Sequence, residues 1–344
     1  MTEFEQRFRL QTLGRSERTP SADFTDRVMS EIRRRAQHGS NLDDRGFTER
    51  VMSEIRRKRR NLRLWRSAAA AVAAVVLGLF SLPSQSPESA ARAWLCSAQN
   101  SDGSWAPEKF GGSQHYRAAL TALSALCLDA EPGKYRGEIL KIRLPLEKIP
   151  SGETQADAYN RALAAFALVS LVQTGRYDEL KPLSEQYLRT LVRSQTPAGA
   201  WTYDTSSGNA ALTAWVVRVL ALSHDDTSAV SLKKGLRWLE KCRRADGSFC
   251  YTPSGETATP TLNAMIACAF EAAGIRMPAH ILPEDNYYSR YFAAESARKN
   301  TTDFSNLRTK IATSIAKNGR FLPDNRWSSV GGDLYAAAFT LLSL

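Results

Sequence analysis

From residue 90 onward, the chain alternates between two kinds of predicted helix. Some stretches mix charged and apolar residues at helical spacing, as in Leu183 to Ser194 and Leu232 to Lys241, which is typical of helices with one wet face. Other stretches hold almost no charge, and a helix that is apolar on every side is expected to be buried. There are five of these: Ala118 to Leu128, Ala162 to Val172, Ala210 to Leu222, Leu262 to Ala273 and Leu334 to Leu344. This alternation predicts an all-α domain over residues 90–344, in which an outer ring of helices wraps an inner ring as an α/α toroid or an open arc of one.

A short loop pattern recurs between these predicted helices. The copies are Trp94-Leu95 with Gln99 and Gly103-Ser104-Trp105, Tyr187-Leu188 with Gln195 and Gly199-Ala200-Trp201, Trp238-Leu239 with Gly247-Ser248-Phe249, and the reduced Asn318-Gly319-Arg320-Phe321. A unit repeated along a chain buries its apolar face against its neighbours. The repeats therefore predict helical hairpins, and the five charge-free stretches put their number at about five.

The Gln-(x3)-Gly-x-Trp loops resemble the QW repeat of squalene-hopene and oxidosqualene cyclases, which prenyltransferase β subunits share in weaker form. The resemblance covers roughly residues 89–344. It implies that the helix before each loop is outer, that the helix after it is inner, and that the inner helices line an apolar cavity for an isoprenoid. It also implies structural roles, with the glutamines capping backbone groups near helix ends, for Gln99, Trp105, Gln195, Trp201 and Phe249.

The motifs that carry chemistry in those families are missing from this sequence. Class II cyclases use a protonated aspartate of Asp-x-Asp-Asp, whereas Asp225-Asp226 is the only adjacent aspartate pair after residue 90 and fits a solvated turn. Prenyltransferases hold zinc with Asp-x-Cys and a distant histidine, but no Asp-x-Cys occurs, and His115, His224 and His280 lack metal-ligand spacing. We therefore expect no metal ion and no cofactor, and the sequence favours binding over catalysis.

Polar and aromatic residues stand at the N-terminal starts of the predicted inner helices. If the ring closes, they gather at one rim, where free N–H groups and positive helix dipole ends suit an anionic or hydroxylated ligand. The alternative is that Asp157, Asn209 and Asp333 only cap helices. The predicted ligand-binding residues are Gln114, His115, Tyr116, Asp157, Tyr159, Asn209, Asn263, Asp333 and Tyr335.

The count of inner helices bears on the choice between binding and catalysis. Five are fewer than the roughly six of a complete cyclase barrel, so we expect a gap in the ring that would protect a carbocation poorly. An enzymatic alternative stays open: a divergent member of the superfamily acting on an isoprenoid or another apolar substrate, with His115 and a rim carboxylate as acid and base.

Residues 67–82 form an uncharged, apolar segment that predicts one transmembrane helix. Seven Lys or Arg residues lie between Arg56 and Arg66, whereas only Arg92 is basic in the 20 residues after the segment. This asymmetry predicts a cytoplasmic N-terminus and an extracytoplasmic, periplasmic C-terminal domain of an inner-membrane protein. The segment is short for a bilayer span, so a buried core helix is the alternative. Residues 83–89, rich in Ser and Pro, read as a linker.

Residues 1–66 form a basic arm that contains its own repeat. Residues 23–35 return as 46–58 with 10 of 13 positions identical. Each copy predicts a basic helix with one apolar stripe, which would lie on the inner membrane surface or bind a cytoplasmic protein partner. The candidate partner-binding residues are Phe24, Val28, Ile32, Phe47, Val51 and Ile55.

The repeated phrase Phe-Thr-(Asp/Glu)-Arg-Val-Met, followed by basic residues and one predicted span, resembles the cytoplasmic end of bacterial anti-sigma-type membrane regulators. That resemblance implies a sigma-factor partner. The arm holds 17 basic and 10 acidic residues, but its cations lie directly before the apolar segment, which favours membrane topology over nucleic-acid binding.

Together, these features predict a single-pass membrane protein whose outer toroid is a sensor or scaffold for an apolar ligand or a protein. A purely structural envelope protein is a further alternative. Cys242 and Cys250 flank one loop, where a disulfide would staple the hairpin if their Cα atoms lie close enough.

Overall fold

A computed structural model describes residues 86–148, 150, 154–204, 208–277, 286–298 and 328–344, together with Ser53 and residues 305–306, 308–309 and 311–312. The arm with its six candidate partner-binding residues, the predicted membrane segment 67–82, residues 83–85 of the linker, His280 and the fourth repeat at 318–321 lie outside the described residues. Among the described helices, none combines the length and apolar character needed to cross a bilayer.

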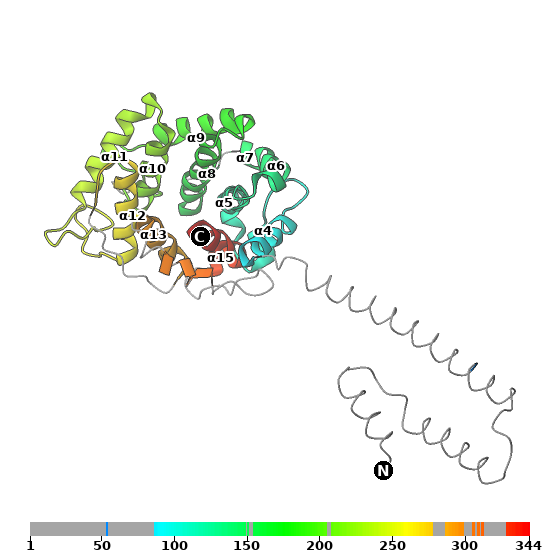
Figure 1. Cartoon of the computed structure of the whole chain (residues 1–344). Coiled ribbons are helices and arrows are strands. Elements are labelled where there is room, and N and C mark those ends of the chain that lie inside the picture. The colour runs from blue at the N-terminus through cyan, green and yellow to red at the C-terminus, as the bar shows by residue number, and fades with distance from the viewer. Residues whose placement is uncertain are drawn as a thin grey trace, which may run out of the picture. The chain divides into compact units, whose positions relative to one another are not determined.

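Six helices of the described chain form a closed inner ring. Each packs against the next, and the last packs against the first (Figure 1). In ring order they are α5 (Arg117–Leu128), α8 (Gln155–Gln173), α10 (Ala210–Ser223), α12 (Pro260–Ala272), α13 (Tyr287–Ala297) and α15 (Ser328–Ser343). The predicted all-α toroid is confirmed.

Outer helices cover this ring, and two of them correspond to the amphipathic stretches 183–194 and 232–241 predicted from sequence. They are α4 (Pro87–Ser97), α6 (Pro132–Lys141), α7 (Arg143–Glu147), α9 (Lys181–Arg193) and α11 (Ala229–Lys241). Short 3-10 turns connect the rings at η1 (Pro107–Phe110), η2 (Gln114–Tyr116), η3 (Asp178–Leu180) and η4 (Asp226–Ser228). Two isolated β-bridges, Arg243 with Phe249 and Cys250 with Ala258, close the loop after α11.

The expectation of five inner helices and a gap in the ring was wrong. The sixth inner helix, α13, fills the place between α12 and α15. Its sequence carries Arg290 and Glu295, so a search for charge-free stretches passes over it. Glu295 is nevertheless neutralised inside the structure by Arg218 of α10, which lets a charged helix occupy an inner position.

Side-chain caps fix where the inner helices begin. Thr154, Asn209, Thr259 and Asn286 each accept a hydrogen bond from a backbone N–H in the first turn of α8, α10, α12 and α13. Such a cap satisfies one of the donors that a helix start leaves free. These polar residues therefore set the N-terminal ends of four neighbouring inner helices.

The glutamine and tryptophan of each complete repeat make the same bonds in both copies. Trp105 Nε1 donates to the Leu95 carbonyl and Trp201 Nε1 to the Leu191 carbonyl, each at 2.7 Å. Gln99 Nε2 donates to the carbonyls of Gly103 (3.0 Å) and Glu138 (2.9 Å). Gln195 Nε2 donates to those of Gly199 (2.8 Å) and Ser231 (2.9 Å). Each loop is thus tied both to the outer helix before it and to the next outer helix.

The backbone of each repeat also bonds to the inner helix that follows. Trp105 N and Trp201 N donate to the hydroxyls of Thr121 and Thr213, each at 3.0 Å. In the third copy, Phe249 N donates to Asn263 Oδ1 at 2.8 Å. Asn263 therefore takes the structural position that threonine holds in the other two repeats.

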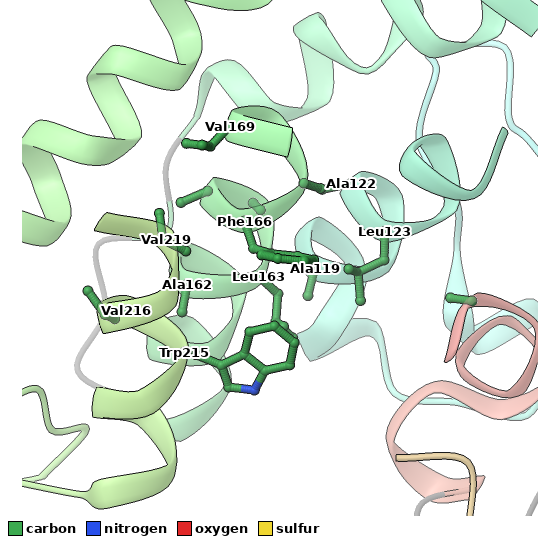
Figure 2. Packing of buried hydrophobic residues seen from close by; sticks show 14 of the residues in the cluster. Ala119, Ala122, Leu123, Ala162, Leu163, Phe166, Val169, Trp215, Val216 and Val219 are labelled. Carbon is green, nitrogen blue, oxygen red and sulfur yellow. The ribbon is translucent and has the colours of Figure 1, made fainter. Parts of the chain in front are cut away.

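The core lies between the inner helices. Phe166 of α8 and Trp215 of α10 meet edge to face, with ring centroids 5.3 Å apart (Figure 2). Trp215 also stacks on Tyr291 of α13 at 6.1 Å. Large rings from α8, α10 and α13 thus meet in the core, while alanines such as Ala119, Ala122 and Ala162 let the helices approach closely.

Candidate ligand-binding cavity

A cavity of about 450 Å³ lies inside the ring, near the N-terminal ends of the inner helices. Its volume falls in the range of small-molecule sites. The described lining residues are Tyr116, Ala119, Leu120, Leu123, Gln155, Tyr159, Leu163, Tyr203, Asn209, Ala211, Tyr251, Thr261, Met265, Tyr288, Val330, Tyr335 and Phe339.

Six of these lining residues are tyrosines, and they come from six different places in the fold. Their positions are η2 (Tyr116), α8 (Tyr159), the loop after α9 (Tyr203), the loop after α11 (Tyr251), α13 (Tyr288) and α15 (Tyr335). Nearly every repeat of the toroid therefore contributes one phenol to the same space.

Several of these phenols are held by neighbours. The Tyr203 hydroxyl accepts from Asn209 Nδ2 at 3.4 Å, and the Tyr288 hydroxyl accepts from Trp215 Nε1 at 2.6 Å. The rings of Tyr159 and Tyr203 lie 6.4 Å apart. These contacts position the aromatic surfaces before any ligand enters.

Burial disfavours the ionised form of four of these phenols. It raises the pKa of Tyr116 and Tyr203, and it raises the pKa of Tyr159 and Tyr288 well above the usual value. Near neutral pH these hydroxyls can donate and accept hydrogen bonds, but they carry no negative charge.

No Asp, Glu, Lys, Arg or His is found among the described residues that line this cavity. A charged group of a ligand would therefore lose its hydration there without meeting an opposite charge, which is costly. The arrangement suits a neutral molecule that offers ring or chain surface to the tyrosines and a few polar atoms to their hydroxyls.

The structure separates the predicted rim residues into two groups. Tyr116, Tyr159, Asn209 and Tyr335 line the cavity, whereas Gln114, His115, Asp157, Asn263 and Asp333 are not among its lining residues.

The residues of the second group have other surroundings. Gln114 and His115 are exposed on η2, and the His115 carbonyl accepts from Asn160 Nδ2 at 2.6 Å. Asp157 accepts from the Thr154 hydroxyl at 2.7 Å at the start of α8, as part of a helix cap. Asp333 is half-buried just after Gly332, whose backbone interrupts α15. Asp225 caps η4, so the aspartate pair lies in a turn.

Sequence reasoning missed Tyr203, Tyr251 and Tyr288. Two of them carried a readable signal, because Tyr203 and Tyr251 each stand two residues after the aromatic residue of a repeat loop. The equal spacing gives both tyrosines the same position in their repeats, and equivalent positions of a repeat are expected to lie in similar places of the fold. Tyr288 belongs to α13, the inner helix that the sequence analysis did not predict.

The cysteines offer little reactivity within the described chain. Cys242 and Cys250 are buried free thiols on the bridged loop, where Cys250 N donates to the Cys242 carbonyl at 3.0 Å. Burial raises the pKa of the Cys242 thiol to about 12, and that of Cys127 also to about 12. Among the described residues, no group of three or more His, Cys, Asp and Glu side chains could hold a metal ion.

A double ring of helices closed around a cavity defines the α/α-toroid class. The chain belongs to the prenyltransferase alpha-alpha toroid domain family, whose model matches residues 10–135 and 138–321. No curated protein matches the chain. The narrower likeness to squalene-hopene cyclases stays a prediction.

Solved structures of similar fold are glycoside hydrolases of low sequence identity. One is the GH76A alpha-1,6-mannanase from Salegentibacter sp. HEL1_6, with 9% identity, 75% of this chain and 96% of that chain covered, and a TM-score of 0.52. An inactive variant of that enzyme in complex with alpha-1,6-mannotriose has 10% identity, the same coverage and a TM-score of 0.54. An alpha-amylase from Clostridium perfringens has 12% identity, 69% and 94% coverage and a TM-score of 0.48. The similarity to the two mannanase structures shows the fold alone.

Proposed function

We propose that this protein is a single-pass membrane protein whose extracytoplasmic toroid binds a neutral, mainly apolar small molecule and acts as a sensor or scaffold. The observation that carries the proposal is the cavity lined by six tyrosines and, among its described lining residues, by no charged side chain. Such a site can bind and orient a molecule through ring contacts and hydroxyl groups.

Three apolar residues of the lining are buried more deeply than two of its polar residues. Leu123, Met265 and Phe339 are buried, at 0%, 4% and 2% exposure, whereas Tyr203 and Asn209 are half-buried. We infer that the apolar body of the ligand lies deep and that a hydroxyl or carbonyl group faces the half-buried rim. An isoprenoid alcohol fits this description, and so does another hydroxylated apolar molecule.

The same lining supports binding over the enzymatic alternative. Alkene protonation needs a strong acid, and glycoside hydrolysis needs two carboxyl groups beside the substrate. The acid and base proposed from sequence were His115 with Asp157 or Asp333, and none of the three is among the described residues around the cavity. A divergent enzyme acting on an isoprenoid remains the second hypothesis, and it lacks an identified acid.

The membrane and signalling parts of the proposal rest on sequence. The apolar segment 67–82 and the basic residues before it support an anchor with the arm in the cytoplasm. The duplicated helix in that arm supports a cytoplasmic protein partner, because two copies raise avidity. Deletion of 67–82 should release the chain from the membrane fraction, and its continued retention there would contradict the anchor.

Ligand binding in the cavity can be tested with a substitution that fills it. Ala211 is 5% exposed and lines the cavity, so Ala211→Phe places a ring where the ligand would lie. We expect a neutral isoprenoid alcohol to raise the melting temperature of the full chain by a few degrees, and not to do so for Ala211→Phe. The carboxylate of the same chain length should have no effect on either protein.

The matched control is Val230→Phe, because Val230 is 63% exposed on α11, far outside the cavity lining. It should respond to the alcohol like the unmodified chain. Equal stabilisation of Ala211→Phe and Val230→Phe would contradict a ligand site in the cavity.

A further inference from the structure

A second cavity, of about 770 Å³, lies near the C-terminal ends of inner helices. Residues near the ends of α5, α8, α10, α13 and α15 line it, together with the start of α4. Its described lining carries six charged side chains: Arg92, Arg218, Arg298, Arg308, Glu88 and Glu295. Unlike the tyrosine-lined cavity, this one has an excess of positive charge.

Arg218 is the unusual member of this set. It is 7% exposed and lies on α10, which is otherwise built of uncharged residues. Its guanidinium carbon lies 4.7 Å from the ring centre of Phe166 and 5.3 Å from that of Tyr291. Burial opposes a charge here, yet Tyr291 and Glu295 raise the pKa of Arg218 above its usual value, so the group stays a cation.

The hydrogen bonds of Arg218 are incomplete within the described chain. Nη2 donates to Glu295 Oε2, whereas Nη1 is buried and has no hydrogen-bond partner among the described residues. Glu295 also pairs with Arg298 at 2.6 Å, so its single negative charge is divided between two guanidinium groups. A buried donor without a partner costs free energy, and an anionic oxygen would relieve that cost.

Two of the other arginines have a structural role, because they bond backbone carbonyls. Arg92 Nε donates to the Cys127 carbonyl at 3.2 Å, and Arg298 Nη2 donates to the Leu342 carbonyl at 2.7 Å. Both bond carbonyls near helix ends, where cations are favourable. Arg218 has no such bond among those found, so helix capping does not account for it.

The sequence directly before the first lining residue indicates a source for the anion. Ser86 and Glu88 line the same cavity, and Ser86 comes four residues after Leu82, the end of the predicted membrane segment. If the anchor is as proposed, only residues 83–85 of the sequence separate the membrane segment from this lining, which favours a lipid headgroup as the source of the anion.

We propose that this cavity binds the phosphate of an anionic membrane lipid headgroup. Arg218 Nη1 is the central donor, and Arg298 and Arg308 lie in the same lining. Nη1 is buried, so the guanidinium must turn toward the cavity before a phosphate can reach it. That turn weakens the bond from Nη2 to Glu295, which keeps its pairing with Arg298. Glu295 thus competes with the lipid for Arg218. The inference rests on the membrane anchor of the proposed function.

This competition predicts that substitutions of Arg218 and of Glu295 change lipid retention in opposite directions. The full chain, reconstituted in nanodiscs of equal phosphatidylcholine and phosphatidylglycerol, should retain one phosphatidylglycerol in native mass spectrometry. Arg218→Lys keeps the charge but loses Nη1, and it should reduce retention about tenfold or more. Glu295→Gln should increase retention, because it removes the competing carboxylate. Arg136→Gln, on an exposed ion pair of α6, should change nothing.

The outcomes separate this inference from the rest of the account. Equal retention by Arg218→Lys and the unmodified chain overturns it, and so does weaker retention by Glu295→Gln. If Arg218→Lys fails to fold, the Glu295→Gln result alone decides. If inorganic phosphate binds with the same dependence on Arg218 while no lipid is retained, the lipid source is overturned. A chain that never enters nanodiscs contradicts the anchor, and inorganic phosphate titration of that soluble chain then tests Arg218 alone.

Discussion

At the scale of single residues, the toroid depends on side chains that replace missing backbone partners. Gln195 illustrates this, because one amide group bonds the carbonyls of Gly199 and Ser231, which belong to two different elements. Trp201 adds a bond from its buried indole to Leu191. Buried or half-buried carbonyls that lose such donors pay a desolvation penalty. These residues therefore act on stability and not on chemistry.

We expect Gln195→Ala to lower the free energy of unfolding by about 1–3 kcal/mol, because two carbonyls lose their donor. Urea unfolding of the full chain measures this change. Gln186→Ala is the control, since Gln186 is exposed on the preceding helix α9 and none of the hydrogen bonds found involves its side chain. Equal effects of the two substitutions would contradict the structural role of Gln195.

At the scale of elements, loops and helices fit closely enough that some positions accept only glycine. Gly103 has φ 86°, a conformation unfavourable for residues with a side chain, and a methyl group there would collide with the Lys141 carbonyl at the end of α6. The repeat loop can therefore approach the next outer helix only through this glycine.

Gly103→Ala should destabilise the protein by about 2 kcal/mol or more, from the left-handed backbone and the collision together. Gly133→Ala, at the start of α6, meets no atom within 4 Å and has no left-handed backbone, so it should be neutral or slightly stabilising. Thermal melting of both variants measures the difference. Similar melting temperatures would show that the loop tolerates a side chain.

The helices and loops also show which parts of the fold could be predicted from the sequence. Five inner helices could be predicted because a helix buried on all sides has almost no charged residues. The repeat loops could be predicted because the same contact, made several times, requires the same residues each time. Helix α13 was missed because Glu295 is neutralised by Arg218, which lies 77 positions earlier in the chain. Likewise, His115 and Asp157 share a predicted rim with Tyr159, but only the fold decides that Tyr159 faces the cavity.

At the scale of the whole domain, one closed ring offers two different cavities. The N-terminal ends of the inner helices surround neutral phenols, and their C-terminal ends surround a buried arginine with positive neighbours. Family membership and fold do not determine what either cavity binds, because toroids of similar fold include a mannanase. The residues that line each cavity determine its ligand, and those around the tyrosine-lined cavity favour a neutral molecule.

The most direct measurement is native mass spectrometry of the full chain, purified under mild conditions from the cells that naturally produce it. The account predicts one neutral, mainly apolar molecule per chain in the unmodified protein and in Val230→Phe, and none in Ala211→Phe. A cavity that stays empty in every preparation, or a bound molecule retained equally by Ala211→Phe, would contradict the central claim.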